Sequence, residues 1–206
     1  MRTLSVALTG GIGSGKSLIC KVFEALGRKV FVSDRVAKTL YFRQDVKAKM
    51  QEFFGNDIYI NNVLDAAKLS SLVFNDKDKL LWLNNLIHPL VKQSYKAFLS
   101  DAQSRGENYV LLESAIVFES SWEDMFDKII CVSTPWDLVL ERTQLRDNTD
   151  RQSVERRISS QMPQQEKEAK SDCIIINDDR ELVVPQIIKI DKELKELSLN
   201  GYKNLD

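Results

Sequence analysis

The sequence predicts an α/β fold in which a mostly parallel sheet of five strands is covered by helices on both faces. Two observations carry this prediction. Short apolar runs alternate along the chain with segments whose apolar residues recur at helical spacing. A glycine-rich loop also joins the first apolar run to the first helical segment, as happens where a buried strand leads directly into a helix.

The predicted strands are short apolar runs, and the first has the length expected for a buried parallel strand. The runs lie at residues 4–8, 30–32, 109–112, 128–132 and 173–176. We expect the second strand to neighbour the first. Ligands of such sheets bind beyond the carboxyl ends of the strands, so the residues that follow the runs are candidates for a binding site. They are Thr9, Asp34, Glu113, Ser133 and Asn177.

The helical segments carry apolar stripes. After Ser17 the apolar residues predict an amphipathic helix that Gly27 can terminate. From residue 35 to about 100 the pattern is helical, with polar turns at 55–57 and 75–76. Further helices are predicted over 137–146 and around 187–197. We therefore expect one domain over residues 1–206, with a core at 1–35 and 101–206 and a helical insertion at 36–100.

The loop after the first strand fits the pattern Gly, four residues, Gly-Lys-Ser/Thr, which wraps nucleotide phosphates. Glycines bring backbone N–H groups close to phosphate oxygens, and the following helix N-terminus favours negative charge. Lys16 would reach the β- and γ-phosphates, and the Ser17 hydroxyl would hold Mg²⁺. The expected phosphate-binding residues are Gly11, Ile12, Gly13, Ser14, Gly15, Lys16 and Ser17. Strand, loop and helix in this order predict a P-loop NTPase-like fold.

The composition argues against several classes of protein. The net charge is −1 at pH 7, so no overall field attracts nucleic acid or an anionic membrane. No apolar run approaches the roughly 20 residues that span a bilayer, and no secretion signal is evident. Cys20, Cys131 and Cys173 lack metal-ligand spacing and are interpreted as reduced packing residues. We expect a cytoplasmic protein with a small-molecule substrate and no nucleic-acid or membrane partner.

Two carboxylates follow predicted strands. Asp34 is a candidate catalytic base, because a carboxylate near bound phosphates can accept the proton of an attacking hydroxyl. The alternative is an N-cap for the next helix, and the glycine loop favours the catalytic role. Glu113 could bind the hydration shell of Mg²⁺, and a strand-end salt bridge is an equal alternative.

Arg142 and Arg146 share one face of a predicted helix and could close over phosphates. Spacing alone favours a solvated face with Glu141 and Asp147 as surface partners. The segment 151–170 is rich in charged and amide side chains and has the composition of a mobile segment.

Two further polar residues have open roles. His88, the only histidine, precedes Pro89 and is therefore expected in an extended or turn conformation, where a structural role is favoured over catalysis. Asn177 could hydrogen-bond an adenine edge or cap a turn.

Several fragments, taken in order, resemble the dephospho-CoA kinases, P-loop enzymes that phosphorylate the 3′-hydroxyl of dephospho-CoA in the last step of coenzyme A synthesis. The fragments span almost the whole chain, and their order and spacing make the resemblance specific. They are residues 8–17, 34, 83–91, 117–119, 140–142, 146–147, 161–163 and 176–177.

The resemblance implies ATP as phosphoryl donor, Asp34 as base, and His88 and Pro89 in an acceptor-binding insertion. It also places Arg142 and Arg146 in a nucleotide-binding lid over about 137–170, with Arg142 acting in catalysis, which reverses the preference from spacing. Asn177 falls among the nucleotide-binding residues. Ala66 stands where the family usually has arginine.

Other functions remain as alternatives at this point. Another P-loop kinase, acting on a nucleoside monophosphate or a sugar acid, would share the donor chemistry. A switch GTPase lacks support, because no Asp is followed three residues later by Gly and no Asn-Lys-x-Asp is present. A nucleotide-binding module without catalysis would require Asp34 and the arginines to be inert.

Overall fold

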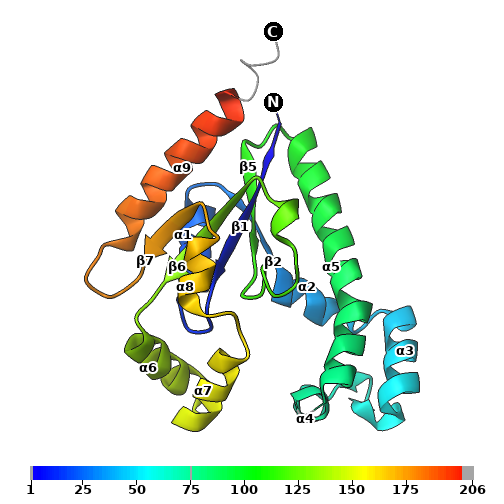
Figure 1. The fold of residues 1–206 in the computed structure, drawn as a ribbon. Helices are drawn as coiled ribbons and strands as arrows, with labels where there is room; N and C mark the ends of the chain where they lie inside the picture. The colour runs from blue at the N-terminus through cyan, green and yellow to red at the C-terminus, as the bar shows by residue number, and fades with distance from the viewer. Residues whose placement is uncertain (1, 75, 201–206) are drawn as a thin grey trace. The chain divides into compact units, whose positions relative to one another are not determined.

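The computed structural model describes residues 2–74 and 76–200. Five strands form one sheet in the order β2-β5-β1-β6-β7 (Figure 1). Their bounds are β1 (Leu4–Gly10), β2 (Lys29–Val32), β5 (Tyr109–Glu113), β6 (Lys128–Ser133) and β7 (Cys173–Ile176). Every predicted strand is confirmed, with ends that differ by at most two residues.

The neighbours of β1 differ from those expected. β1 pairs in parallel with β5 and with β6, and β6 pairs in parallel with β7. β2 lies beyond β5, so the expectation that the second strand neighbours the first is wrong. The reason is that apolar runs predict strands but carry no signal for their order in the sheet. β1 is therefore the central strand, and all seven of its residues are buried.

Two long helices cover one face of this sheet. α1 (Lys16–Ala25) and α9 (Val183–Asn200) pack against each other and against strands. Their stripes include Phe23 and Ile187, which are fully buried together with Val6 and Leu8 of β1. Arg28, just after α1, donates from Nε to Asp191 of α9 at 2.7 Å. Because successive side chains of a strand point to opposite faces of the sheet, alternate residues of β1 pack into this core.

The segment between β6 and β7 is helical. It contains α6 (Trp136–Asp147), α7 (Arg151–Ser159) and α8 (Gln164–Ala169). α6 confirms the helix predicted over 137–146. α7 begins after Asp150, whose carboxylate accepts a hydrogen bond from Ser153 N at 2.9 Å as an N-cap. α8 packs against β6 and β1, so the last part of the segment lies on the sheet.

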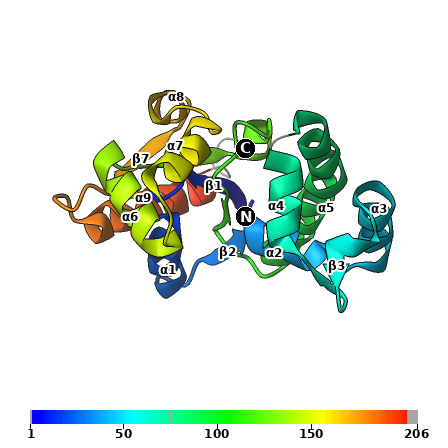
Figure 2. The same ribbon diagram turned by 90° about the horizontal axis from the view of Figure 1, so that it is seen from below.

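Residues 32–97 form a second compact unit, and the rest of the chain forms the first. Its elements are α2 (Ser33–Leu40), α3 (Gln44–Phe54), a 3₁₀ turn (Asn56–Ile58), β3 (Tyr59–Ile60), β4 (Val63–Leu64), α4 (Ala66–Phe74) and α5 (Lys77–Ser104). α5 continues into the first unit. The labels in Figure 2 locate α2, α3, α4, α5 and β3. The helical character predicted for this stretch is confirmed, while residue 75 of the predicted turn at 75–76 lies outside the described residues.

The hairpin formed by β3 and β4 was not predicted. Its turn residues Asn61 and Asn62 have φ angles of 50° and 66°. Asparagine tolerates this left-handed region, and two such residues match the right-handed twist of the strands in a tight hairpin. The signal was present in the Asn-Asn pair between two short apolar runs, but the surrounding helical pattern hid it.

α5 runs straight through His88 and Pro89, so the prediction of an extended or turn conformation at His88 is wrong. Proline removes one backbone donor and disfavours the helical region for the residue before it. Burial of one apolar face of the helix, before and after Pro89, outweighs this cost. On this face Ile87, Val91 and Tyr95 are at most 4% exposed. Packing of an apolar helix face has overridden a local preference.

Across residues 2–74 and 76–200, no helix has the length and apolar character needed to cross a membrane.

Candidate functional site

The glycine loop connects β1 to α1 and has a backbone that only glycine adopts easily. Gly13 and Gly15 have φ angles of 74° and 91°. A Cβ at Gly13 would collide with the Thr143 hydroxyl on α6, and one at Gly15 would collide with the Asn177 side-chain amide. The loop is thus in close contact with two elements, and its sequence is required by both conformation and space.

Side chains that follow β6 and β7 hold the loop from outside. The Ser14 carbonyl accepts hydrogen bonds from Thr134 Oγ1 at 3.0 Å and from Asn177 Nδ2 at 2.8 Å. The Asn177 backbone N donates to the Ser133 carbonyl at 2.8 Å. Three of the residues expected beyond strand ends therefore meet at one edge of the sheet: Thr9 with its loop, Ser133 and Asn177. The Asn177 amide nitrogen is used to hold the loop.

Lys16 is the first residue of α1, and only 9% of it is exposed. Its Nζ donates to the Gly10 and Gly11 carbonyls at 3.1 and 3.0 Å. Ser17 lies in the first turn of α1 and is exposed. Two consecutive residues at the positive end of the α1 dipole therefore carry an ammonium and an exposed hydroxyl.

Three hydroxyl oxygens around the loop have unmet hydrogen-bonding capacity. Among the described residues, Thr9 Oγ1, Ser14 Oγ and Thr143 Oγ1 are buried and accept or donate no hydrogen bond. Buried polar groups without partners are rare, and each needs an explanation such as a bound ligand. Their gathering at the loop marks it as a place for a polar molecule.

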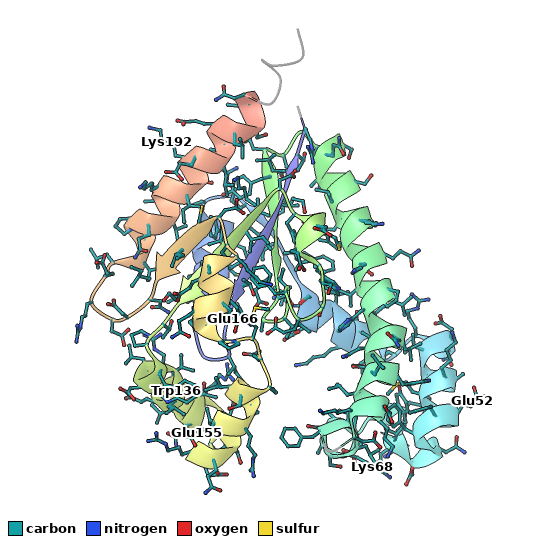
Figure 3. The ribbon with its side chains drawn as sticks, in the orientation of Figure 1. Glu52, Lys68, Trp136, Glu155, Glu166 and Lys192 are labelled. Atoms are coloured by element: carbon teal, nitrogen blue, oxygen red, sulfur yellow. The ribbon has the colours of Figure 1, made fainter. Side chains whose placement is uncertain are left out.

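A cavity of about 670 Å³ lies beside the loop. Its walls include Gly11, Ile12, Thr134, Trp136, Gln161 and Gln164. Figure 3 labels Trp136 at the start of α6, Glu155 on α7 and Glu166 on α8, the three helices beside this cavity. The volume falls in the range of small-molecule sites, and one side of it is formed by loop backbone. Sequence reasoning missed Trp136 and Gln164, because a single aromatic or amide residue carries no motif. Gln161 was noted only as part of the fragment 161–163 that resembles the family, with no role assigned to it.

Arg142 and Arg146 lie on α6 with different partners. Arg142 donates from Nη1 to the Asn177 carbonyl at 3.3 Å and forms an ion pair with Asp179. Arg146 pairs with Asp147 at 2.7 Å, and Arg157 of α7 pairs with the same carboxylate. These two guanidinium groups hold the pKa of Asp147 well below its usual range. The surface pair expected between Arg146 and Asp147 is present, while Arg142 pairs with Asp179 in place of Glu141.

Glu113 is the last residue of β5, and it is buried opposite Leu8 of β1. The next residue, Ser114, donates from its backbone N to the Leu8 carbonyl at 3.1 Å. Glu113 is thus fixed at the strand end next to the one that leads into the glycine loop. Its role toward a metal ion stays a prediction.

Asp34, His88 and Pro89 belong to the second unit. Asp34 lies in the first turn of α2 and is exposed; the N-cap of α2 is Val32, so Asp34 is not the N-cap. Burial chiefly, then the Tyr59 and Asp34 charges, raise the pKa of Tyr41 to about 12. Within this unit Asp34 therefore lies near Tyr41, a residue that sequence reasoning did not single out.

His88 is half-buried in α5. Burial chiefly, and the neighbouring Lys92 charge, lower its pKa below the usual 6.5. The imidazole is therefore neutral at pH 7 and can donate and accept hydrogen bonds.

Comparison with known proteins agrees with the geometry. A family model described as dephospho-CoA kinase matches residues 4–182. The dephospho-CoA kinase of Bacteroides fragilis is 31% identical over 91% of each chain, and that of Fusobacterium nucleatum is 34% identical over 86% of this chain and 91% of its own.

Solved structures share the fold. A crystal structure of a Thermus thermophilus protein superposes with a TM-score of 0.81 at 26% identity, covering 96% of this chain and 99% of its own. The dephospho-CoA kinase from Campylobacter jejuni superposes with a TM-score of 0.69 at 24% identity, covering 93% and 97%. Because the family model matches most of the chain and these relatives are more than 30% identical to it, the chain belongs to the dephospho-CoA kinase family.

Proposed function

We propose that this protein transfers the γ-phosphoryl group of ATP to the 3′-hydroxyl of dephospho-CoA, giving coenzyme A and ADP. The observation that carries the proposal is the glycine loop, with Lys16 at its end and a cavity of about 670 Å³ beside it, in a chain of this family. The loop supplies the donor site, and family membership supplies the acceptor.

The donor site acts through position and charge. Loop amides and the Lys16 ammonium would bind the phosphate oxygens and stabilise the negative charge that shifts during transfer. On phosphate binding, Lys16 would exchange its hydrogen bonds to the Gly10 and Gly11 carbonyls for stronger charge-assisted ones. Arg142 and Arg146 would add positive charge from α6, and Asn177 keeps the loop in shape.

The residues present fit Mg²⁺ as a partner of the nucleotide. The described residues contain no group of three or more acidic, histidine or cysteine side chains that could hold a metal ion by itself. Mg²⁺ keeps several waters and binds through few protein ligands together with substrate phosphates, and the exposed Ser17 hydroxyl suits this mode. When bound, Mg²⁺ neutralises phosphate charge.

The acceptor step requires a base. We assign Asp34 to accept the proton of the 3′-hydroxyl while its oxygen forms a bond to the γ-phosphorus. The bond from that phosphorus to the bridging oxygen breaks, and ADP leaves with the electron pair. His88 and Pro89 are assigned to the acceptor-binding region of the second unit.

The test offers alternative acceptors separately. ADP release from ATP and Mg²⁺ is measured with dephospho-CoA, AMP, dTMP or gluconate. We expect stimulation by dephospho-CoA alone. Stimulation by AMP, dTMP or gluconate without dephospho-CoA would instead establish a different small-molecule kinase.

A further inference from the structure

The connection between α7 and α8 contacts the glycine loop through one side chain. Gln161 Oε1 accepts a hydrogen bond from the Ile12 backbone N at 2.9 Å. The same oxygen lies 3.9 Å from the place that a Cβ on Gly11 would take. An amide side chain from a connection far along the chain thus touches the backbone that the proposed function assigns to phosphate.

The backbone next to Gln161 is tied to the segment after β5. Met162 N donates to Glu119 Oε1 at 2.8 Å. Lys167 Nζ lies 2.8 Å from the same carboxylate oxygen and donates to the Ala115 carbonyl at 2.6 Å. The carboxylate therefore joins the connection, α8 and the segment after β5 at one point.

The burial of Lys167 makes these contacts of Glu119 costly to break. Its side chain is fully buried, with 0% exposed, while that of Glu119 is 22% exposed. An ammonium in such a place is tolerated only with its partners, because losing one leaves an uncompensated buried charge. A movement of the connection that broke the Glu119 contacts would carry this cost. Gln161 is therefore attached to a fixed point of the first unit.

We propose that Gln161 is a positioning residue for phosphate binding, and that the buried pair of Lys167 and Glu119 holds it in place. By pairing with the Ile12 amide, Gln161 fixes the first part of the loop before a nucleotide arrives. Binding then loses less conformational entropy in ordering the loop. This inference rests on the proposed nucleotide site. It also implies that Gln161 lies outside the mobile part of the expected lid.

The experiment measures ADP affinity in the presence of Mg²⁺ by calorimetry, together with KM for ATP and for dephospho-CoA. Gln161→Ala removes one neutral hydrogen bond, and we expect ADP affinity to fall about three- to tenfold. KM for ATP rises in step, while KM for dephospho-CoA stays unchanged. Lys167→Met lowers ADP affinity by a similar factor. The double variant binds ADP no more weakly than the single variant with the lower affinity, because both substitutions act through the same contact.

A matched control separates positioning from stability. Arg28→Met removes one ion-pair partner of another largely buried carboxylate, that of Asp191 in α9, which keeps Lys195 as a partner. We expect it to lower Tm as Lys167→Met does, with ADP affinity equal to wild type. If Lys167→Met does not fold, Gln161→Ala decides alone.

Unchanged ADP affinity in Gln161→Ala would overturn the inference, and so would tighter binding, which would mean that Gln161 competes with phosphate. A wild-type protein that binds ADP but forms no coenzyme A would contradict the proposed function, while the ADP titrations would still decide the role of Gln161. A wild-type protein that binds no ADP would overturn both.

Discussion

The proposed reaction requires two different tasks of single residues, phosphate binding and proton transfer. In the proposed reaction, Lys16 and the loop amides would bind charge that is present before and during transfer, whereas Asp34 would accept the proton of the acceptor. The two positions should therefore respond differently to substitution. Lys16 was identified from a motif, while Asp34 was identified from its place after an apolar run.

Asp34→Asn is expected to lower turnover by a factor of about 10² to 10⁴, because the amide cannot accept the proton. ADP affinity should remain within about twofold of wild type, since phosphate contacts stay intact. Steady-state kinetics and calorimetry measure the two effects. Asp45→Asn is the control, because Asp45 also lies exposed in the first turn of a helix, α3. Wild-type turnover in purified Asp34→Asn would show that another group is the base.

The depressed pKa of His88 predicts a stability that depends on pH. Burial holds the pKa below 6.5 in the folded chain, so protons bind the unfolded chain more readily as pH falls through 6.5. The free energy of unfolding should therefore decrease toward acidic pH and decrease less in His88→Gln. Urea unfolding at about pH 7.5 and about pH 5.5 measures both slopes. Equal losses in the two proteins would contradict the role of His88.

Among the helices and strands, apolar periodicity predicted the elements that are determined by local sequence. The strands β1, β5, β6 and β7 were found because a run such as Val6-Ala7-Leu8 has no polar residue to place in water. The order of β2 and β5, the hairpin at Asn61 and Asn62, and the helix through Pro89 depend on partners distant in sequence. The contact of Gln161 with the loop was invisible for the same reason.

Gly15→Ala tests whether the loop is shaped by space as well as by conformation. Gly15 and Gly27 have φ angles of 91° and 82°, but only a Cβ at Gly15 would meet another residue, the amide of Asn177. Both substitutions incur backbone strain of about 1 kcal/mol. We expect Gly15→Ala to lower Tm further than Gly27→Ala and to weaken ADP binding at least about tenfold. Equal ADP affinity in the two variants would show that the loop tolerates a side chain there.

In the whole molecule, the proposed function assigns the donor and the acceptor to different compact units. The donor residues from Gly11 to Ser17, with Arg142 and Asn177, belong to the unit that contains the sheet. Asp34 and His88 belong to residues 32–97, the unit assigned to the acceptor. Sequence alone indicated both parts and placed the insertion at 36–100. The contacts that would select dephospho-CoA could not be predicted, because they depend on tertiary structure that no motif encodes.

The position of the new phosphate in the product distinguishes phosphorylation of the 3′-hydroxyl from every other use of ATP. Wild-type protein, ATP, Mg²⁺ and dephospho-CoA are incubated, and the product is examined by phosphorus NMR and mass spectrometry. We expect one ADP for each acceptor molecule converted, with a new phosphomonoester on the ribose 3′-oxygen. ADP formed without a phosphorylated acceptor, or phosphate on any other oxygen of dephospho-CoA, would contradict the proposed function.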